Sequence, residues 1–233
     1  MIADLHLGLS VDKPMDIFGP GWEQHERRLR ENWCARVRAE DTVFVPGDIS
    51  WGMDLEQAMA DLRYLSQLPG TKILSKGNHD YWWGTVGKME AALERQGIWN
   101  IHFLHNNAYL VENKIFCGSK GYLRDGEESD AQNQKLMERE AQRFAHSVRE
   151  GLALRERAGE ALELIALFHY PPVTPQQRNE GILALLRRHG IGRCYYGHIH
   201  GMGTRTAITG PFEGVELSLV SADFLSFVPK IIE

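Results

Sequence analysis

Seven side chains able to bind metal ions stand in short polar motifs along the chain. They are two carboxylates, one amide and four imidazoles: Asp4, His6, Asp48, Asn78, His169, His198 and His200. Several of them follow apolar runs that are typical of β-strands. The set exceeds what one tetrahedral ion needs, and it suits two ions that share a bridging carboxylate. A single histidine is more often a core or surface residue, but the donors taken together predict a metal site.

Two pairs of these donors have a spacing that favours binding in one pocket. Residues i and i+2 of an extended segment point the same way, so Asp4 with His6, and His198 with His200, can each present two donors. Glycines beside several of the motifs permit tight turns and close approach of the backbone. Mixed nitrogen and oxygen donors favour a borderline ion such as Mn, Fe or Zn over Mg or Ca.

The apolar pattern places the first motifs after strands that alternate with helices. We expect strands at residues 1–3, 41–45 and 71–75 and helices at residues 22–38, 55–68 and 85–96. A polar motif follows each of these strands. This order is typical of an α/β sheet with parallel central strands, in which ligands bind beyond the carboxyl ends of the strands.

The second half of the chain predicts short strands and one long helix. We expect strands at residues 101–104, 108–112, 114–117, 162–168 and 193–196, helices at 130–158 and 176–189, and two antiparallel strands at 215–220 and 224–228. No internal repeat, low-complexity segment or linker divides the sequence. We therefore expect a single domain over residues 1–233.

The composition indicates an ordinary globular protein. Of the 233 residues, 43% are hydrophobic and 24% are charged, and the net charge is −5. This charge disfavours nucleic acid as a partner, and no apolar run approaches membrane-spanning length. The three cysteines are widely separated, so we expect buried free thiols at Cys117 and Cys194. The sequence shows no signal peptide, so we expect a cytoplasmic location. The oligomeric state is not indicated.

In their order along the chain, the motifs resemble those of the calcineurin-like metallophosphoesterase superfamily. The resemblance rests on Asp-x-His, Gly-Asp, Gly-Asn-His-Asp, a lone His after a strand, and Gly-His-x-His, and it runs from Asp4 to His200. Residues 12–19 and 78–83 also resemble a bacterial branch of predicted phosphohydrolases. The implied fold is α/β, a four-layer αββα sandwich with two mixed β-sheets flanked by helices. The resemblance implies more strand before Asp4 than residues 1–3 supply, so the first strand would be unusually short or the chain would begin late.

The same resemblance implies a centre of two divalent metal ions. The first ion would be held by Asp4, His6, Asp48 and His200, and the second by Asp48, Asn78, His169 and His198, with Asp48 as the bridge. A hydroxide that bridges the ions would attack phosphorus in line. His79 is then the candidate general acid for the leaving group, and Asp80 would hold its ring and raise its pKa.

The substrate implied is a small phosphomonoester or phosphodiester, with a nucleotide among the candidates. The eukaryotic Ser/Thr protein phosphatases continue the second motif with a phosphate-binding Arg, whereas Ile49 follows Asp48 here. The lipid-A-pathway pyrophosphatases carry Arg at the position of His79. Candidate substrate contacts are Trp51, Trp82, Tyr170 and Arg124. Packing at a sheet edge is the alternative for the aromatic residues, and a solvated surface cation is the alternative for the arginine.

Two other functions remain open at this point. Some members of the superfamily have lost ligands and serve as scaffolds for protein assembly, and such a protein would be metal-free. A hydrolase with a single zinc ion and a protein general base would bind one ion per chain in place of two. The intact set of donors favours the dinuclear phosphoesterase.

Overall fold

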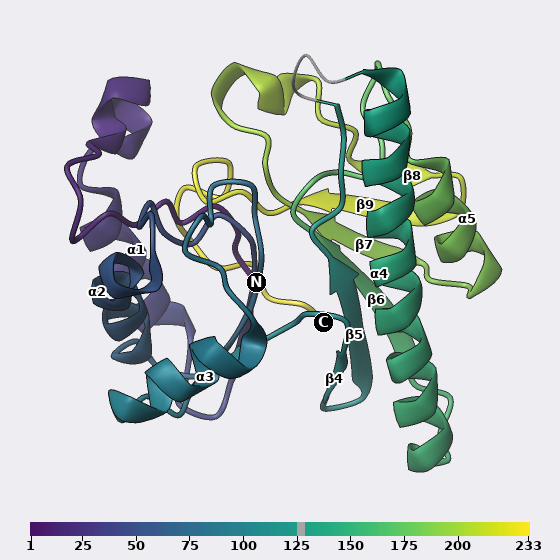
Figure 1. Cartoon of the computed structure of the whole chain (residues 1–233), viewed down its shortest axis with the longest axis horizontal. Helices are drawn as coiled ribbons and strands as arrows, with labels where there is room; N and C mark the ends of the chain where they lie inside the picture. The colour runs from purple at the N-terminus through teal and green to yellow at the C-terminus, as the bar shows by residue number, and fades with distance from the viewer. Residues whose placement is uncertain (125–128) are drawn as a thin grey trace. The chain divides into compact units, whose positions relative to one another are not determined.

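A computed structural model of the chain describes residues 1–124 and 129–233 (Figure 1). The chain divides into two compact units. Unit one consists of Met1–Phe103 and Val220–Glu233, and unit two is Leu104–Leu219. Each unit contains one β-sheet with its own helices. The single domain expected over residues 1–233 stays a prediction.

Unit one is built around a three-stranded parallel sheet. Its strands are β1 (Thr42–Pro46), β2 (Thr71–Ser75) and β3 (Ile101–Phe103), in the order β1-β2-β3. The helices are α1 (His25–Arg36), α2 (Leu55–Ser66) and α3 (Val86–Arg95), and two short 3-10 helices, η1 (Met15–Phe18) and η2 (Pro20–Trp22), precede α1. The predicted alternation of strands and helices is confirmed from β1 to α3. Because the strands are parallel, the loops after β1 and β2 leave the same edge of the sheet.

Side-chain contacts fix both ends of α2. At its start, Asp54 accepts a hydrogen bond from the backbone N–H of Gln57 at 2.9 Å, which satisfies a free donor of the first turn. Beyond its end, the Nζ of Lys72 on β2 donates to the carbonyl oxygens of Leu68 and Gly70. Lys72 is fully buried, and this burial lowers its pKa to about 8. The segment after α2 is therefore tied to the middle strand of the sheet.

The first three residues of the chain do not form the expected strand. Ala3 pairs with Ser221 as an isolated parallel bridge, its N–H donates to the carbonyl of Val220 at 2.8 Å, and its carbonyl accepts from Ala222 at 2.9 Å. On the other side, the N–H of Ile2 donates to the carbonyl of Phe44 on β1 at 3.2 Å. The segment thus lies between β1 and residues that follow the end of unit two in the sequence.

In its described residues, 104–124 and 129–219, unit two contains a six-stranded mixed sheet and two α-helices. The strands are β4 (Ala108–Val111), β5 (Lys114–Ser119), β6 (Glu163–Phe168), β7 (Arg193–Tyr196), β8 (Gly210–Phe212) and β9 (Val215–Leu219). They are arranged β4-β5-β6-β7-β9-β8, with a parallel centre and antiparallel pairs at both edges. The helices are α4 (Asp130–Ala158) and α5 (Glu180–Arg188), and a 3-10 helix, η3, spans Gly201–Arg205. The sheet of unit two is therefore mixed, whereas the named strands of unit one are all parallel.

Two expectations for the second half of the chain were wrong in detail. The antiparallel partner of residues 215–219 is β8, and residues 224–227 form turns in which Ser226 and Phe227 have positive φ values of 53° and 63°. Left-handed residues cannot continue a ladder of extended strands. The helix expected from residue 176 begins only at Glu180, because the side chain of Asn179 caps it by accepting from the N–H of Ile182 at 3.2 Å.

Two cysteines have the state that was expected from the sequence. Cys117 and Cys194 are buried free thiols, and burial raises the pKa of Cys117 to about 12. Gly151 of α4 is needed for close packing on β5, since a Cβ there would lie 2.5 Å from the Sγ of Cys117. Among the helices of the described residues, none is long and apolar enough to cross a membrane.

Candidate metal centre

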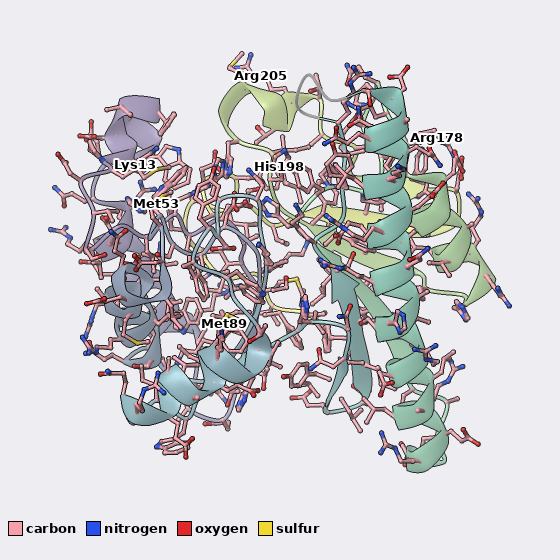
Figure 2. The ribbon with its side chains drawn as sticks, in the orientation of Figure 1. Lys13, Met53, Met89, Arg178, His198 and Arg205 are labelled. Carbon is pink, nitrogen blue, oxygen red and sulfur yellow. The ribbon has the colours of Figure 1, made fainter. Side chains whose placement is uncertain are left out.

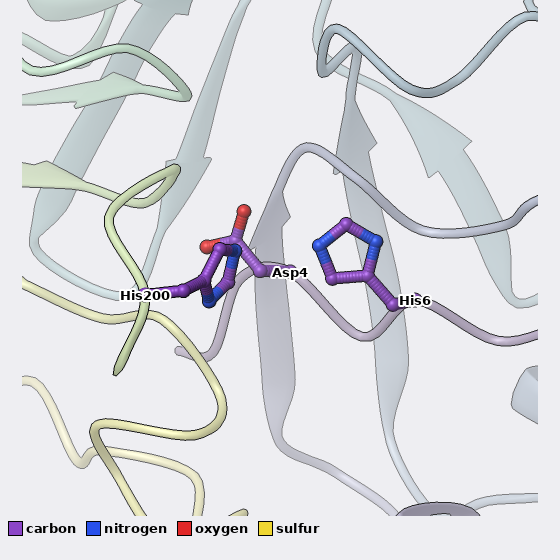
Figure 3. Close-up of side chains that lie close together, drawn as sticks. All are labelled: Asp4, His6 and His200. Atoms are coloured by element: carbon purple, nitrogen blue, oxygen red, sulfur yellow. The ribbon is translucent and has the colours of Figure 1, made fainter. Parts of the chain in front are cut away.

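Unit one brings three of the predicted donors together. Asp4, His6 and Asp48 are 0%, 4% and 2% exposed. The Nε2 of His6 lies 3.8 Å from the Oδ2 of Asp48, and Asp4 has a carboxylate oxygen within 4.8 Å of a ligand atom of each of the other two. Figure 3 shows Asp4 and His6 on their loop; His200, also labelled there, belongs to unit two.

The chemistry of this cluster fits a divalent cation. Two buried carboxylates so close to one another repel, and each loses the hydration that stabilises its charge in water. A bound cation offsets both costs, and the neighbouring imidazole supplies a nitrogen donor of the kind that Mn, Fe and Zn accept. The donor set of unit one therefore favours a metal site over a set of buried polar residues that only pack.

The donors converge because the backbone is left-handed at all three of them. The φ values are 59° at Asp4, 46° at His6 and 52° at Asp48, which costs about 1–3 kcal/mol for each residue other than glycine. Hydrogen bonds between the two loops maintain this conformation: Asp4 N–H donates to Gly47 O at 2.9 Å, and His6 N–H donates to Asp48 O at 3.0 Å. The extended segment expected for Asp4 and His6 is thus replaced by a strained one.

Gly77 allows the third motif to approach Asp48 very closely. A Cβ at this position would lie 2.1 Å from the Oδ1 of Asp48 and 2.2 Å from its backbone nitrogen. Two residues later, the backbone N–H of His79 donates to the same Oδ1 at 2.8 Å. Asn78 lies between them and is half-buried. The loop after β2 is therefore packed directly against Asp48.

Asp80 has a different role from the one expected. Five N–H groups of the described residues donate to its carboxylate: Asp48 N and Gly77 N to Oδ2 at 2.9 and 2.7 Å, and Ile49 N, Ser50 N and Trp82 Nε1 to Oδ1 at 2.9, 3.2 and 3.0 Å. The His79 ring is not among these partners. Complete burial raises the pKa of Asp80, and the hydrogen bonds from Gly77, Ile49 and Ser50 act in the opposite direction. The carboxylate holds the loop after β1 against the loop after β2, and it does not orient His79.

Trp51 supports the imidazoles of unit one. Its ring stacks on His6 with the centroids 4.9 Å apart and an interplanar angle of 23°, and it lies 4.5 Å from the ring of His79. The Nζ of Lys13, labelled in Figure 2, lies 4.3 Å from the centre of Trp51, and the Trp51 Nε1 donates to the Sδ of Met15 at 3.2 Å. The Trp51 ring, which was expected to stack on a substrate, thus contacts side chains of the protein.

The other expected substrate contacts also have protein partners. Trp82 is 3% exposed and donates to Asp80, so it belongs to the buried structure under the loops. Tyr170 is 2% exposed, and its ring lies 4.2 Å from that of His198. Both rings are buried in this structure, and their contact with a substrate stays a prediction. Arg124 is exposed and forms an ion pair with Asp130 at 2.8 Å.

Unit two carries the three remaining histidines of the predicted donor set, which follow neighbouring strands. His169 follows β6 directly and is fully buried, and His198, labelled in Figure 2, follows β7 with a positive φ of 71°. Their rings lie 5.1 Å apart, and the N–H of Gly197 donates to the carbonyl of His169 at 3.0 Å. His200 is half-buried and comes two residues later. The carboxyl ends of β6 and β7 thus bring His169 and His198 together.

His25 is a supporting residue that the sequence did not indicate. It is 4% exposed, and its Nε2 donates to the carbonyl of His6 at 3.3 Å. Burial lowers its pKa, while the neighbouring carboxylate of Glu26 raises it. His25 lies outside every polar motif at the start of α1, so its contact with the donor loop could be found only in the structure.

With this geometry in place, the comparisons with known proteins identify the family. A family model described as calcineurin-like phosphoesterase matches residues 1–202. The chain belongs to the calcineurin-like phosphoesterase family. Its two sheets and, within the described residues, its five α-helices are consistent with the fold expected from the motifs. Membership of this family and the donors of unit one together support a metal-dependent phosphoesterase.

The similar proteins extend the comparison in sequence and in structure. The Gene 66 protein of Mycobacterium phage L5 is 37% identical over 78 residues, and that of Mycobacterium phage D29 is 42% identical over 79 residues. These matches cover 34% of this chain and 37% and 38% of the phage proteins, so the chain spans little more than a third of their length. AQ665, a protein of unknown function from Aquifex aeolicus, aligns over 98% of this chain and 91% of its own, with a TM-score of 0.52 and 16% identity. That likeness supports the fold alone.

Proposed function

We propose that this calcineurin-like phosphoesterase uses two divalent metal ions to hydrolyse a small phosphomonoester or phosphodiester. The buried pair of carboxylates, Asp4 and Asp48, beside the imidazole of His6 supports the proposal best. Such a cluster needs positive charge, and the nitrogen donor favours Mn, Fe or Zn. The net charge of −5 makes a small phosphorylated molecule a better substrate candidate than a nucleic acid.

The proposed ligands follow the motifs of the family. They are Asp4, His6, Asp48 and His200 for one ion, and Asp48, Asn78, His169 and His198 for the other. Asp48 is the proposed shared ligand, since its two oxygens have different neighbours, His6 at Oδ2 and the N–H of His79 at Oδ1. When bound, two such ions lower the pKa of bound water and neutralise charge on the phosphate oxygens.

Replacing Asp48 by alanine tests the shared ligand. We expect the purified wild-type protein to contain two divalent ions per chain and the Asp48→Ala variant to lose both, because each ion would lose a carboxylate oxygen. Metal content is measured by mass spectrometry after dialysis against Mn²⁺, with turnover of phosphomonoesters and phosphodiesters measured in parallel. Asp12→Asn removes one exposed carboxylate and is the matched control.

The outcome of that measurement separates the alternative functions. One ion per wild-type chain would favour a mononuclear hydrolase, and a wild-type protein without metal or turnover would favour a protein-assembly scaffold. An Asp48→Ala variant that keeps both ions would contradict the proposed bridge.

His79 is proposed to give a proton to the leaving group. Its backbone N–H is fixed on Asp48 at 2.8 Å, and its ring lies against Trp51 at 4.5 Å. We expect His79→Ala to lower kcat for an alkyl phosphate by about 10²-fold or more, as for loss of a general acid, with metal content unchanged. An aryl phosphate with a good leaving group should show a much smaller loss, because its leaving oxygen needs no proton.

A second histidine variant controls for general effects on the enzyme. His102 is exposed on β3 and lies outside the motifs, so His102→Ala should leave kcat for both substrates unchanged. Equal losses of kcat on the alkyl and aryl phosphates in His79→Ala would rule out the role of proton donor.

A further inference from the structure

Asp61 is a fully buried carboxylate on α2 that the proposed chemistry does not use. It is 0% exposed, and its helix neighbours Leu62 and Leu65 belong to the apolar core of unit one. A buried carboxylate is costly unless hydrogen bonds compensate for its lost hydration. The partners that compensate for Asp61 therefore indicate what it does in the fold.

Both oxygens of Asp61 accept hydrogen bonds from loops that carry metal donors. The backbone N–H of Leu9 donates to Oδ1 at 2.9 Å, and the hydroxyl of Ser50 donates to Oδ2 at 2.5 Å. The Ser50 oxygen in turn accepts from the N–H of Gly52 at 3.0 Å. One carboxylate on helix α2 thus binds two separate segments of the chain.

The two segments held by Asp61 are direct continuations of the donor loops. Leu9 comes three residues after His6, and Ser50 comes two residues after Asp48. Between them, Leu7 N–H donates to Ile49 O at 3.0 Å, in the parallel bridge that pairs Leu7 with Ser50. A shift of either segment relative to α2 would therefore change the separation of His6 and Asp48.

We propose that Asp61 is a positioning residue that sets the distance between the donors of the Asp4–His6 loop and Asp48. The inference rests on the proposed metal-dependent function. Asp61 acts through Leu9 and Ser50 and, among the described residues, its hydrogen bonds go to these two. It complements Asp80, which holds the loop after β1 against the loop after β2.

The test measures how the unloaded protein binds Co²⁺, whose visible absorption reports coordination geometry. Chelator-treated wild type, Asp61→Asn, Ser50→Ala and the double variant are titrated with Co²⁺, and their melting temperatures are recorded. We expect Asp61→Asn to weaken Co²⁺ binding by about 10–100-fold, as for loss of a group that orients metal ligands, and to change the absorption bands. Ser50→Ala should show a smaller effect of the same kind. The double variant should differ little from Asp61→Asn, because Ser50 acts through Asp61.

The control variant and the remaining outcomes decide the inference. Glu56→Gln removes an exposed carboxylate from the same helix and should leave Co²⁺ binding unchanged. A lower melting temperature in Asp61→Asn with wild-type affinity and spectrum would make Asp61 a purely structural residue and overturn the proposal. If Asp61→Asn does not fold, Ser50→Ala decides by the same criterion. A wild-type protein that binds no Co²⁺ would overturn the proposed function, and this inference with it.

Discussion

Replacing Asp80 by asparagine should destabilise unit one by about 2–6 kcal/mol, although the two side chains have nearly the same shape. Two N–H groups point at one carboxylate oxygen and three point at the other. Whichever way the asparagine amide turns, its NH2 group faces at least two of these donors. Each buried donor left unsatisfied costs about 1–3 kcal/mol, which is a large part of the roughly 5–15 kcal/mol that stabilises a typical domain.

Tryptophan fluorescence during urea unfolding can measure this loss in unit one. All six tryptophans lie between residues 22 and 99, so their emission reports on unit one. Asp12→Asn makes the same chemical change at an exposed position and should shift the unfolding midpoint very little. Trp82→Phe removes a single donor to Asp80 and should have a smaller effect than Asp80→Asn. An Asp80→Asn variant as stable as the Asp12→Asn control would show that the carboxylate does not hold the loops together.

Replacing Gly77 by alanine should weaken metal binding by about 100-fold, the upper end of the loss that follows removal of a group that orients metal ligands. The added Cβ would lie 2.1 Å from the Oδ1 of Asp48 and 2.2 Å from its backbone nitrogen. A backbone atom cannot turn away as a flexible side chain can, so one of the two loops must move. Such overpacking commonly costs about 1–3 kcal/mol of stability, and here the displaced residue is the proposed shared ligand.

A nearby glycine offers a matched control for this variant. A Cβ added at Gly84 would have open space around it, with no atom of a more distant residue within 4 Å, so Gly84→Ala should bind metal as the wild type does. Isothermal titration with Mn²⁺ compares the two variants, and circular dichroism checks that both are folded. A folded Gly77→Ala variant with the affinity of Gly84→Ala would show that Asp48 is not a ligand, or that the loops adjust without cost.

The elements that carry the motifs could be predicted because their signals are local. The long helix was expected at residues 130–158, and the structure has Asp130–Ala158, since the Ser129 side chain caps its start and Gly159 ends it in a left-handed conformation with φ of 68°. Apolar runs located β1, β2 and β6 to within two residues. A strand was also expected at 224–228, a segment that is apolar except for Ser226, but the backbone turns there.

The contacts that organise the donors were not predictable, because they join residues far apart in the sequence. Asp80 reaches the N–H groups of residues 30 to 32 positions earlier, and Asp61 bonds to a backbone N–H 52 positions away. A sequence pattern places Asp80 next to His79 and so suggested a partner for its ring. It cannot show that five N–H groups donate to the Asp80 carboxylate, nor that the backbone is left-handed at Asp4.

The return of residues 220–233 to unit one has a consequence for the order of folding. Unit two is one continuous stretch, Leu104–Leu219, whereas unit one needs two stretches separated by that whole length. On a ribosome, unit two would be fully synthesised while Ala3 still lacked its partners Val220 and Ala222. Closing so long a loop carries an entropic cost that local contacts avoid. Until Ala222 emerges, the loop bearing Asp4 and His6 is therefore anchored on one side alone, so the centre can mature only after Ala222 has been synthesised.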